Sequence, residues 1–61
     1  MTLKQFLIRY KITSAEFAKG VRVSMPTVSS WRQGISLPRP KMMKRIEKKT
    51  GGKVKIKDWF L

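Results

Sequence analysis

The chain has 61 residues, of which 15 are Lys or Arg and three are Asp or Glu, for a formal net charge of +12. A chain of this length buries only about 60% of its unfolded surface, so it has no room for a large core together with an enclosed substrate cavity. It has no Cys, which excludes disulfides and thiolate metal sites. Charge of this density opposes compaction and therefore predicts a polyanionic partner.

Catalytic chemistry has few residues available to it. The chain contains no His, so the usual general base, proton shuttle and imidazole metal ligand are missing. The three acids are scattered, at Glu16, Glu47 and Asp58, and the run from Gly51 to Lys53 does not have the spacing of a phosphate loop. We therefore expect no enzymatic activity, no cofactor, no metal and no small-molecule ligand. No apolar run is long enough for a signal peptide or a membrane span, so we expect a soluble cytoplasmic protein without a membrane partner.

The first expected helix covers residues 2 to 9 or 10. Thr2 is in position to cap it. One apolar face has the i, i+3, i+4, i+7 spacing of a buried stripe, namely Leu3, Phe6, Leu7 and Tyr10. Ile12 then precedes the next cap as a hydrophobic staple.

The stretch from Thr13 to Gly34 predicts two short helices joined by a tight turn. Thr13 and Glu16 form a capping box that starts the first of them, over residues 14 to 20 or 21. Ser24 caps the second, Pro26 falls in its first turn, where a missing N–H costs nothing, and Gly34 ends it. The apolar residues that would hold the pair together are Phe17, Ala18 and Val21 in the first helix, with Val28 and Trp31 in the second.

Beyond this pair, the prolines at 38 and 40 predict a loop over residues 35–39, because each pushes its predecessor to extended geometry. Pro40 then begins a helix that continues to about Lys49 and is ended by two glycines. Its inward residues are Met42, Met43 and Ile46, and its outward residues are Lys41, Lys44, Arg45, Lys48 and Lys49.

Residues 53–61 fit two structures. The alternation of Lys and apolar residues over 53–57 has the period of a half-buried strand. In the other interpretation, Asp58 caps a final helical turn that carries Trp59, Phe60 and Leu61.

The stretch 13–34 resembles the helix-turn-helix of the lambda repressor and Cro family of phage regulators. The matching positions are Phe17, Ala18, Val21, Val23, Val28 and Trp31, and the phrase VSMPTVSSW is close to the family's usual turn and second helix. Further matches at Pro38, Ile46, Glu47 and Thr50-Gly51-Gly52 extend the resemblance over about residues 3–58. It implies one all-α, lambda repressor-like DNA-binding domain of four or five helices over residues 1–61. An α+β Cro fold with a C-terminal strand is the alternative.

One position departs from the family pattern. The family usually has Gly in the turn, where this chain has Arg22. A left-handed backbone costs a residue other than Gly about 1 kcal/mol. Either Arg22 adopts that strained conformation, or Gly20 takes the unusual dihedrals and the turn is reshaped.

The resemblance implies that the helix over residues 24–33 enters the DNA major groove, where the first residues of a recognition helix reach base edges. The residues expected to contact bases are Met25, Pro26, Thr27, Ser29 and Ser30. This set lacks the Gln, Asn or Arg that make bidentate base contacts, so DNA shape is expected to supply part of the specificity. The residues expected to contact phosphates lie at helix N-termini or carry charge near them, namely Ser14, Arg22, Arg32, Gln33, Arg39 and Lys41.

We therefore predict a sequence-specific regulator of transcription that binds double-stranded DNA. The favoured version is a Cro-like repressor on a palindromic operator, in a bacterial or phage-infected cell. It is expected to act as a homodimer, formed either in free solution or only on DNA, with Trp59, Phe60 and Leu61 as candidate dimer contacts. Two alternatives remain, a nonspecific nucleic-acid binder and an antitoxin-like module that uses the same helices to hold a protein.

Overall fold

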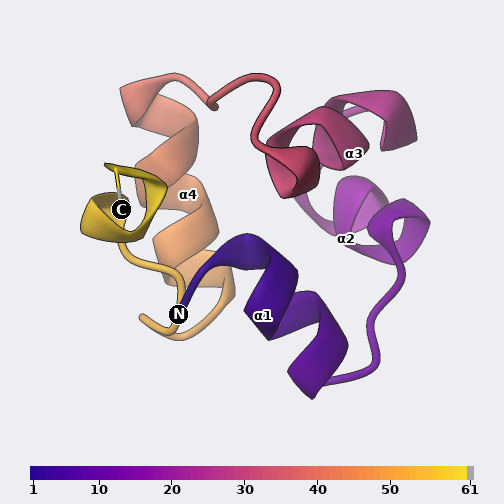
Figure 1. Ribbon diagram of the computed structural model, residues 1–61, viewed down its shortest axis with the longest axis horizontal. Helices are drawn as coiled ribbons and strands as arrows, with labels where there is room; N and C mark the ends of the chain where they lie inside the picture. The colour runs from indigo at the N-terminus through magenta and orange to yellow at the C-terminus, as the bar shows by residue number, and fades with distance from the viewer. Residues whose placement is uncertain (61) are drawn as a thin grey trace.

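The computed structural model describes residues 1–60, and its regular elements over that range are all helical (Figure 1). They are α1 (Leu3–Arg9), α2 (Ser14–Val21), α3 (Met25–Gln33), α4 (Pro40–Lys49) and a short 3-10 helix, η1 (Ile56–Phe60). The prediction of a small all-α fold is confirmed, and the α+β alternative is wrong, since residues 1–60 contain no strand. None of these helices is both long and apolar enough to cross a membrane.

Side-chain caps decide where the first three helices begin. The hydroxyl of Thr2 accepts the N–H of Gln5 at 3.2 Å, and that of Thr13 accepts the N–H of Glu16 at 3.1 Å. Gln5 and Glu16 each accept the N–H of their own cap residue in return, which completes two capping boxes. This bond from the backbone of Thr13 lowers the pKa of Glu16. Ser24 caps α3 in the same way, so all three helices start where their caps predict.

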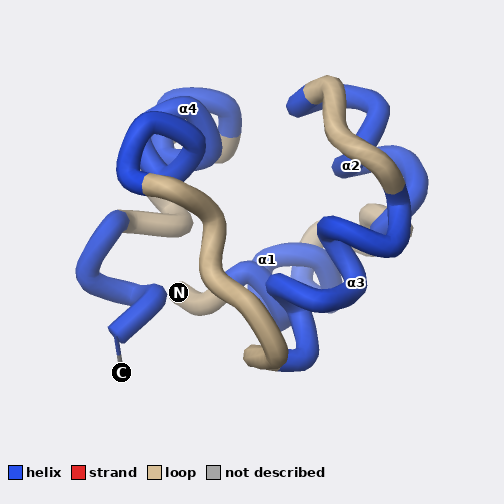
Figure 2. Tube along the Cα trace, turned by 90° about the horizontal axis from the view of Figure 1, so that it is seen from above, coloured by secondary structure: helices blue, strands red, loops and turns tan. Residues whose placement is uncertain are grey.

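The core lies where α1, α2 and α3 meet α4 and the chain that follows it (Figures 1 and 2). Its buried members are Leu3, Phe6, Leu7, Phe17, Ala18, Val21, Val28, Trp31, Ile46 and Val54, with Ile12, Val23, Met42 and Trp59 packed against them. Two aromatic contacts link distant parts of the chain: Phe6 meets Phe17 with ring centroids 6.3 Å apart, and Trp31 meets Trp59 at 6.4 Å.

Two residues predicted to face inward are less buried than expected. Tyr10 is 44% exposed, because α1 ends at Arg9 and the backbone leaves helical geometry at Tyr10; its ring lies against Phe6 at 5.0 Å. Met42 is half-buried at the edge of the core, whereas Met43 and Ile46 carry the inner face of α4. The prediction was therefore wrong for Tyr10 and too strong for Met42.

The segment that follows α4 keeps the burial pattern of a strand without forming one. Val54 is fully buried and Ile56 half-buried, while the lysines between and beside them are exposed. The N–H groups here make local bonds: that of Val54 is donated to the Thr50 hydroxyl at 3.1 Å, and that of Asp58 to the Lys55 carbonyl at 3.0 Å. The carbonyl of Lys53 accepts the Met1 amine at 2.7 Å. These bonds replace a ladder to a neighbouring strand.

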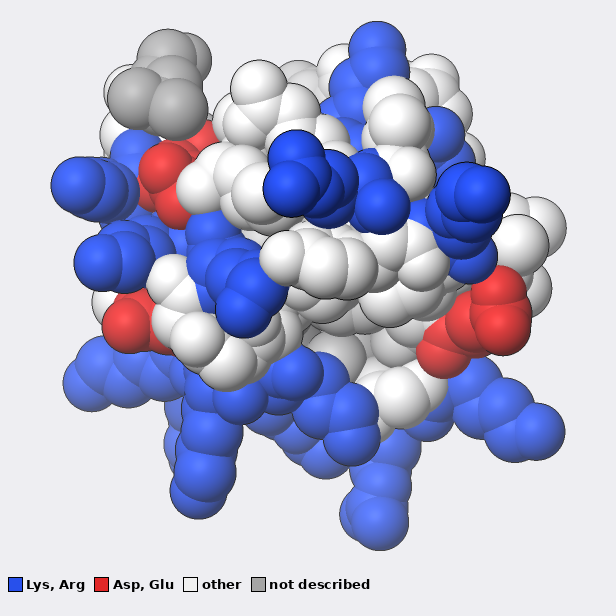
Figure 3. Space-filling model, turned by 90° about the horizontal axis from the view of Figure 1, so that it is seen from below, with Lys and Arg blue, Asp and Glu red and all other residues white. Residues whose placement is uncertain are grey.

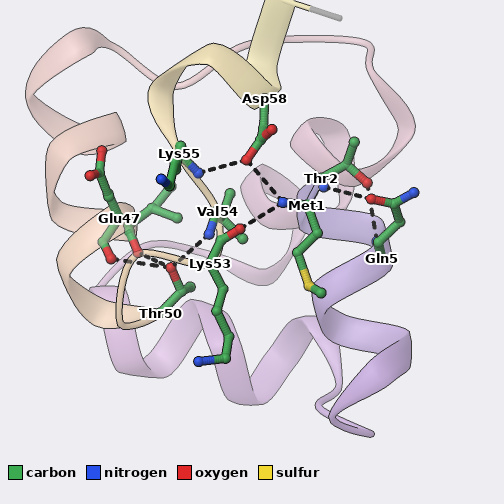
Figure 4. Close-up of polar contacts among 10 residues, drawn as sticks. Met1, Thr2, Gln5, Glu47, Thr50, Lys53, Val54, Lys55 and Asp58 are labelled. Atoms are coloured by element: carbon green, nitrogen blue, oxygen red, sulfur yellow. Dashed lines mark hydrogen bonds and ion pairs between the residues drawn. The ribbon is translucent and has the colours of Figure 1, made fainter.

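The alternative in which Asp58 caps a final helical turn is wrong, because η1 already begins at Ile56. Its carboxylate instead accepts the N–H of Lys55 at 2.8 Å and pairs with the amine of Met1 at 3.1 Å (Figure 4). The Lys55 bond is the main cause that lowers the pKa of Asp58. The contact joins the two ends of the described chain, and Leu61 lies outside the described residues.

Thr50 is the one buried polar residue among residues 1–60, and its hydroxyl connects α4 to the following segment. It donates to the Ile46 carbonyl at 2.9 Å while accepting the Val54 N–H (Figure 4). Since a Thr at the end of a basic helix has no distinctive spacing, the sequence did not reveal this role.

We expect Thr50→Val to destabilise the protein, because Val keeps the shape but leaves the buried Val54 N–H without an acceptor. The loss should be about 1–3 kcal/mol in the free energy of unfolding, measured by urea denaturation. Ser36→Ala in the exposed loop is the control and should stay within about 0.5 kcal/mol. A Thr50→Val protein as stable as this control would contradict the role assigned to the hydroxyl.

Candidate nucleic-acid interface

The α2–α3 pair is closed by a turn in which Arg22 takes the left-handed conformation, with φ 62° and ψ 46°. Its N–H is donated back to the carbonyls of Ala18 and Lys19 at the end of α2. Gly20 lies inside α2 and has an ordinary helical backbone. The sequence left open whether Arg22 or Gly20 takes the left-handed conformation. In the structure it is Arg22, at a steric cost.

The side of α3 that faces the core is apolar and fully covered. Val28 is 0% exposed and Trp31 8%, and across from them Phe17, Ala18 and Val21 of α2 are also buried. Val23, in the turn, is half-buried and packs against the same cluster. Because this inner face is filled, the remaining residues of α3 are left on its outer side.

The residues predicted to contact bases lie along the first two turns of α3 with different exposure. Met25 and Pro26 are exposed, and Thr27, Ser29 and Ser30 are half-buried. The hydroxyl of Thr27 is 2.7 Å from that of Ser24, within the cap. The hydroxyl of Ser29 accepts a bond from the Gln33 amide at 2.9 Å. Ser30 takes part in neither contact, so its hydroxyl is better placed for an external partner.

Two of the residues predicted to contact phosphates come together in space. Arg32, in the last turn of α3, donates from Nη1 to the hydroxyl of Ser14, the first residue of α2, at 3.5 Å. Both side chains are half-buried, and the pair places a guanidinium beside the N-terminus of α2. Gln33 is exposed one residue further along α3.

The other predicted phosphate residues lie elsewhere on the surface. Arg39 and Lys41 flank Pro40 at the start of α4 and are exposed. Arg22 is exposed in the turn before α3, at the opposite end of that helix from Arg32. The six residues are therefore spread over both ends of α3 and the start of α4.

The positive charge of this surface is almost uncompensated. Among residues 1–60 the only ion pair joins the Met1 amine to Asp58, so no Lys or Arg side chain has an acidic partner there. Figure 3 shows one face of the molecule, seen from below, on which Lys and Arg side chains project widely and the few acidic ones lie at the edges of the view. A field of one sign attracts polyanions and speeds their association.

Sequence reasoning missed a group of cations further along α4. Lys44, Arg45 and Lys48 line a shallow groove together with Arg39, Lys41 and Met42. They had been assigned only to the outer side of the helix. The signal that would have found them is their spacing, since 41, 44, 45 and 48 have the same i, i+3, i+4, i+7 pattern that marks an apolar face.

Comparison with known protein families agrees with this geometry. The family model described as helix-turn-helix, of the lambda repressor and Cro type, matches residues 3–55. The chain belongs to this family, whose members are DNA-binding regulators and generally not enzymes. No curated protein and no solved structure matches the chain significantly. The protein is thus a DNA-binding regulator of the helix-turn-helix type.

Replacing Arg22 should reveal the strain in the turn. Arg22→Gly and Arg22→Ala both remove the guanidinium, but only Gly adopts the left-handed conformation without a steric cost. We expect the Gly variant to have a free energy of unfolding about 1 kcal/mol higher than the Ala variant, measured by urea denaturation. Equal stability of the two variants would mean that the turn relaxes to another conformation.

Proposed function

We propose that the protein is a Cro-like repressor that acts in the cytoplasm. It binds a palindromic operator as a homodimer, with α3 in the major groove. The observation that carries this proposal is the two-sided character of α3. Its inner side is buried at Val28 and Trp31, while its N-terminal residues Met25 and Pro26 are exposed in an uncompensated positive field. A helix of this kind fits the major groove of B-DNA.

Recognition of bases through this helix combines short polar and apolar groups. Met25 and the methyl of Thr27 suit the methyl group of thymine, and the hydroxyl of Ser30 offers one hydrogen bond to a base edge. None of these side chains makes a bidentate contact, so each position contributes modest discrimination. The width and deformability of the operator then contribute at positions that the protein does not touch.

Contacts to the phosphates hold α3 in register. The Ser14–Arg32 pair supports one contact at the N-terminus of α2, and Gln33 is exposed next to Arg32 at the end of α3. Arg39 and Lys41 are exposed at the start of α4. If each of the four cations among the predicted phosphate residues, Arg22, Arg32, Arg39 and Lys41, neutralises one phosphate, the plot of log K against log salt has a slope of about −3.6, since each such contact contributes about −0.9.

A two-fold dimer on a palindromic site fixes the distance between its two copies of α3. Successive major-groove faces lie about 34 Å apart, so the centre of each α3 stands about 17 Å from the axis. The loop that follows α3, residues 35–39, is a candidate for the contact between the two copies. Ile35 and Leu37 in that loop are 72% and 50% exposed, which supplies apolar surface for the second copy. Phe60 is also exposed, whereas Trp59 packs on Trp31 and serves the core.

Selection of bound duplexes from a random pool, followed by footprinting, tests this proposal. We expect an enriched palindromic site with half-sites one helical turn apart. A pool without enrichment would favour a nonspecific nucleic-acid binder and contradict the proposal. A stable complex with an acidic protein that is unaffected by Thr27→Ala or Ser30→Ala would favour the protein-interaction module instead.

Ser30→Ala separates base recognition from phosphate binding. We expect its affinity for the selected site to fall about fivefold, which corresponds to the net value of about 1 kcal/mol for one hydrogen bond. Its affinity for random duplex should not change, because that term is independent of sequence. Fluorescence anisotropy at one fixed salt concentration measures both, with Ser36→Ala as the control. An equal loss on both duplexes would mean that Ser30 contacts no base.

A further inference from the structure

The outward side of α4 carries a row of cations along its full length. Met43 and Ile46 fix the inner side of this helix in the core. With 100° per residue, positions 41, 44, 45 and 48 cluster on the side opposite to them, and all four side chains are exposed. We call Lys41, Lys44, Arg45 and Lys48 the α4 stripe. It extends over about 10 Å of helix.

Apart from Lys41 at its start, the α4 stripe lies on a different side of the molecule from the outer side of α3. Figures 1 and 2 both place α4 and α3 on opposite sides of the core, and α4 packs on η1 and α2. The body between them measures 23 × 21 × 18 Å. DNA is stiff, with a persistence length of about 150 base pairs, so a duplex seated on α3 does not bend around so small a body at low cost. Lys44, Arg45 and Lys48 of the stripe therefore remain accessible while α3 is occupied.

The chemistry of the stripe suits a phosphate backbone. Its cations form the walls of a shallow groove whose one uncharged lining residue is Met42. No carboxylate pairs with them within residues 1–60. No aromatic residue lies on α4, so the platform on which single-stranded bases stack is missing. The apolar side of α4 is buried in the core and cannot enter a membrane surface, as a basic amphipathic helix would require.

From these observations we infer that the α4 stripe is a second DNA-binding surface, which holds a second duplex by its phosphates while α3 holds the first. The inference rests on DNA binding by α3, but it requires neither a palindromic operator nor a homodimer. One protein molecule then bridges two duplex segments without reading the sequence of the second. The second contact is of the nonspecific kind, and its strength falls steeply with salt.

A capture assay tests the bridge directly. A duplex is immobilised and loaded with the native protein, free protein is washed away, and a fluorescent second duplex is added at low salt. We expect the native protein to retain the second duplex. The variant Lys44→Gln/Arg45→Gln/Lys48→Gln should retain at least about tenfold less, and the salt slope of capture should become shallower by about 3. Lys41 is left unchanged because it is also a predicted phosphate contact of the first duplex.

The matched control is Lys4→Gln/Arg9→Gln/Lys57→Gln, which removes the same number of Lys and Arg side chains from exposed positions outside α4. It has the same net charge as the stripe variant and should keep the capture of the second duplex. Thermal melting checks that both variants are folded, and anisotropy measures their binding to a single duplex. The affinity of the stripe variant for a single duplex should fall less than about threefold, since its remaining contacts belong to α3.

Several results would overturn the inference. The first is that the native protein captures no second duplex. The second is that the stripe variant captures as much as the native protein, as expected if a dimer holds one duplex on each α3. The third is that the stripe variant loses single-duplex binding and capture to the same extent. Retention of labelled polyglutamate but not of duplex would assign the stripe to acidic proteins, and this too would overturn it. Failure of the operator selection together with intact capture would contradict the repressor proposal alone, so the two proposals fail separately.

Discussion

The close packing of α2 against α3 is the contact on which the rest of the structure depends. Ala18 is small and almost fully buried, and it belongs to the same core cluster as Val28 of α3. Trp31 extends from the same side of α3 to Trp59, so α3 is held both by α2 and by the end of the described chain. Because a packed interior does not absorb extra volume, a larger side chain at position 18 would separate the helices and misdirect the outer side of α3.

The second constraint is charge. A formal charge of +12 on a small body favours expansion, and a single ion pair within residues 1–60 does little to offset it. Local hydrogen bonds oppose that repulsion. They are the three hydroxyl caps of the helices, the bond from the Val54 N–H to the Thr50 hydroxyl and the bond from the Lys55 N–H to the Asp58 carboxylate. DNA that binds the folded arrangement of α3 more tightly than the unfolded chain stabilises the fold. Stability and function are thereby coupled.

Local features were predictable because their causes lie within a few residues. Thr2, Thr13 and Ser24 mark the helix starts through hydroxyl bonds to residues three positions ahead. The end of the described chain was not predictable in the same way. Alternating burial at Val54 and Ile56 is common to a half-buried strand and to the irregular segment found here. Only the presence of a neighbouring strand distinguishes them, and that is a property of the whole fold.

The sequence by itself determined the helices, the apolar side of each and the residues left on the outside of α3, because these follow from caps and from periodic spacing. It also indicated the family, through the resemblance of residues 13–34 to the helix-turn-helix of the lambda repressor and Cro family. Only the tertiary structure decided that Arg22 is the strained residue of the turn, that Ser14 meets Arg32, and that the cations of α4 lie across the core from α3. These facts depend on how helices cross, and crossing is set by packing between residues far apart in the chain.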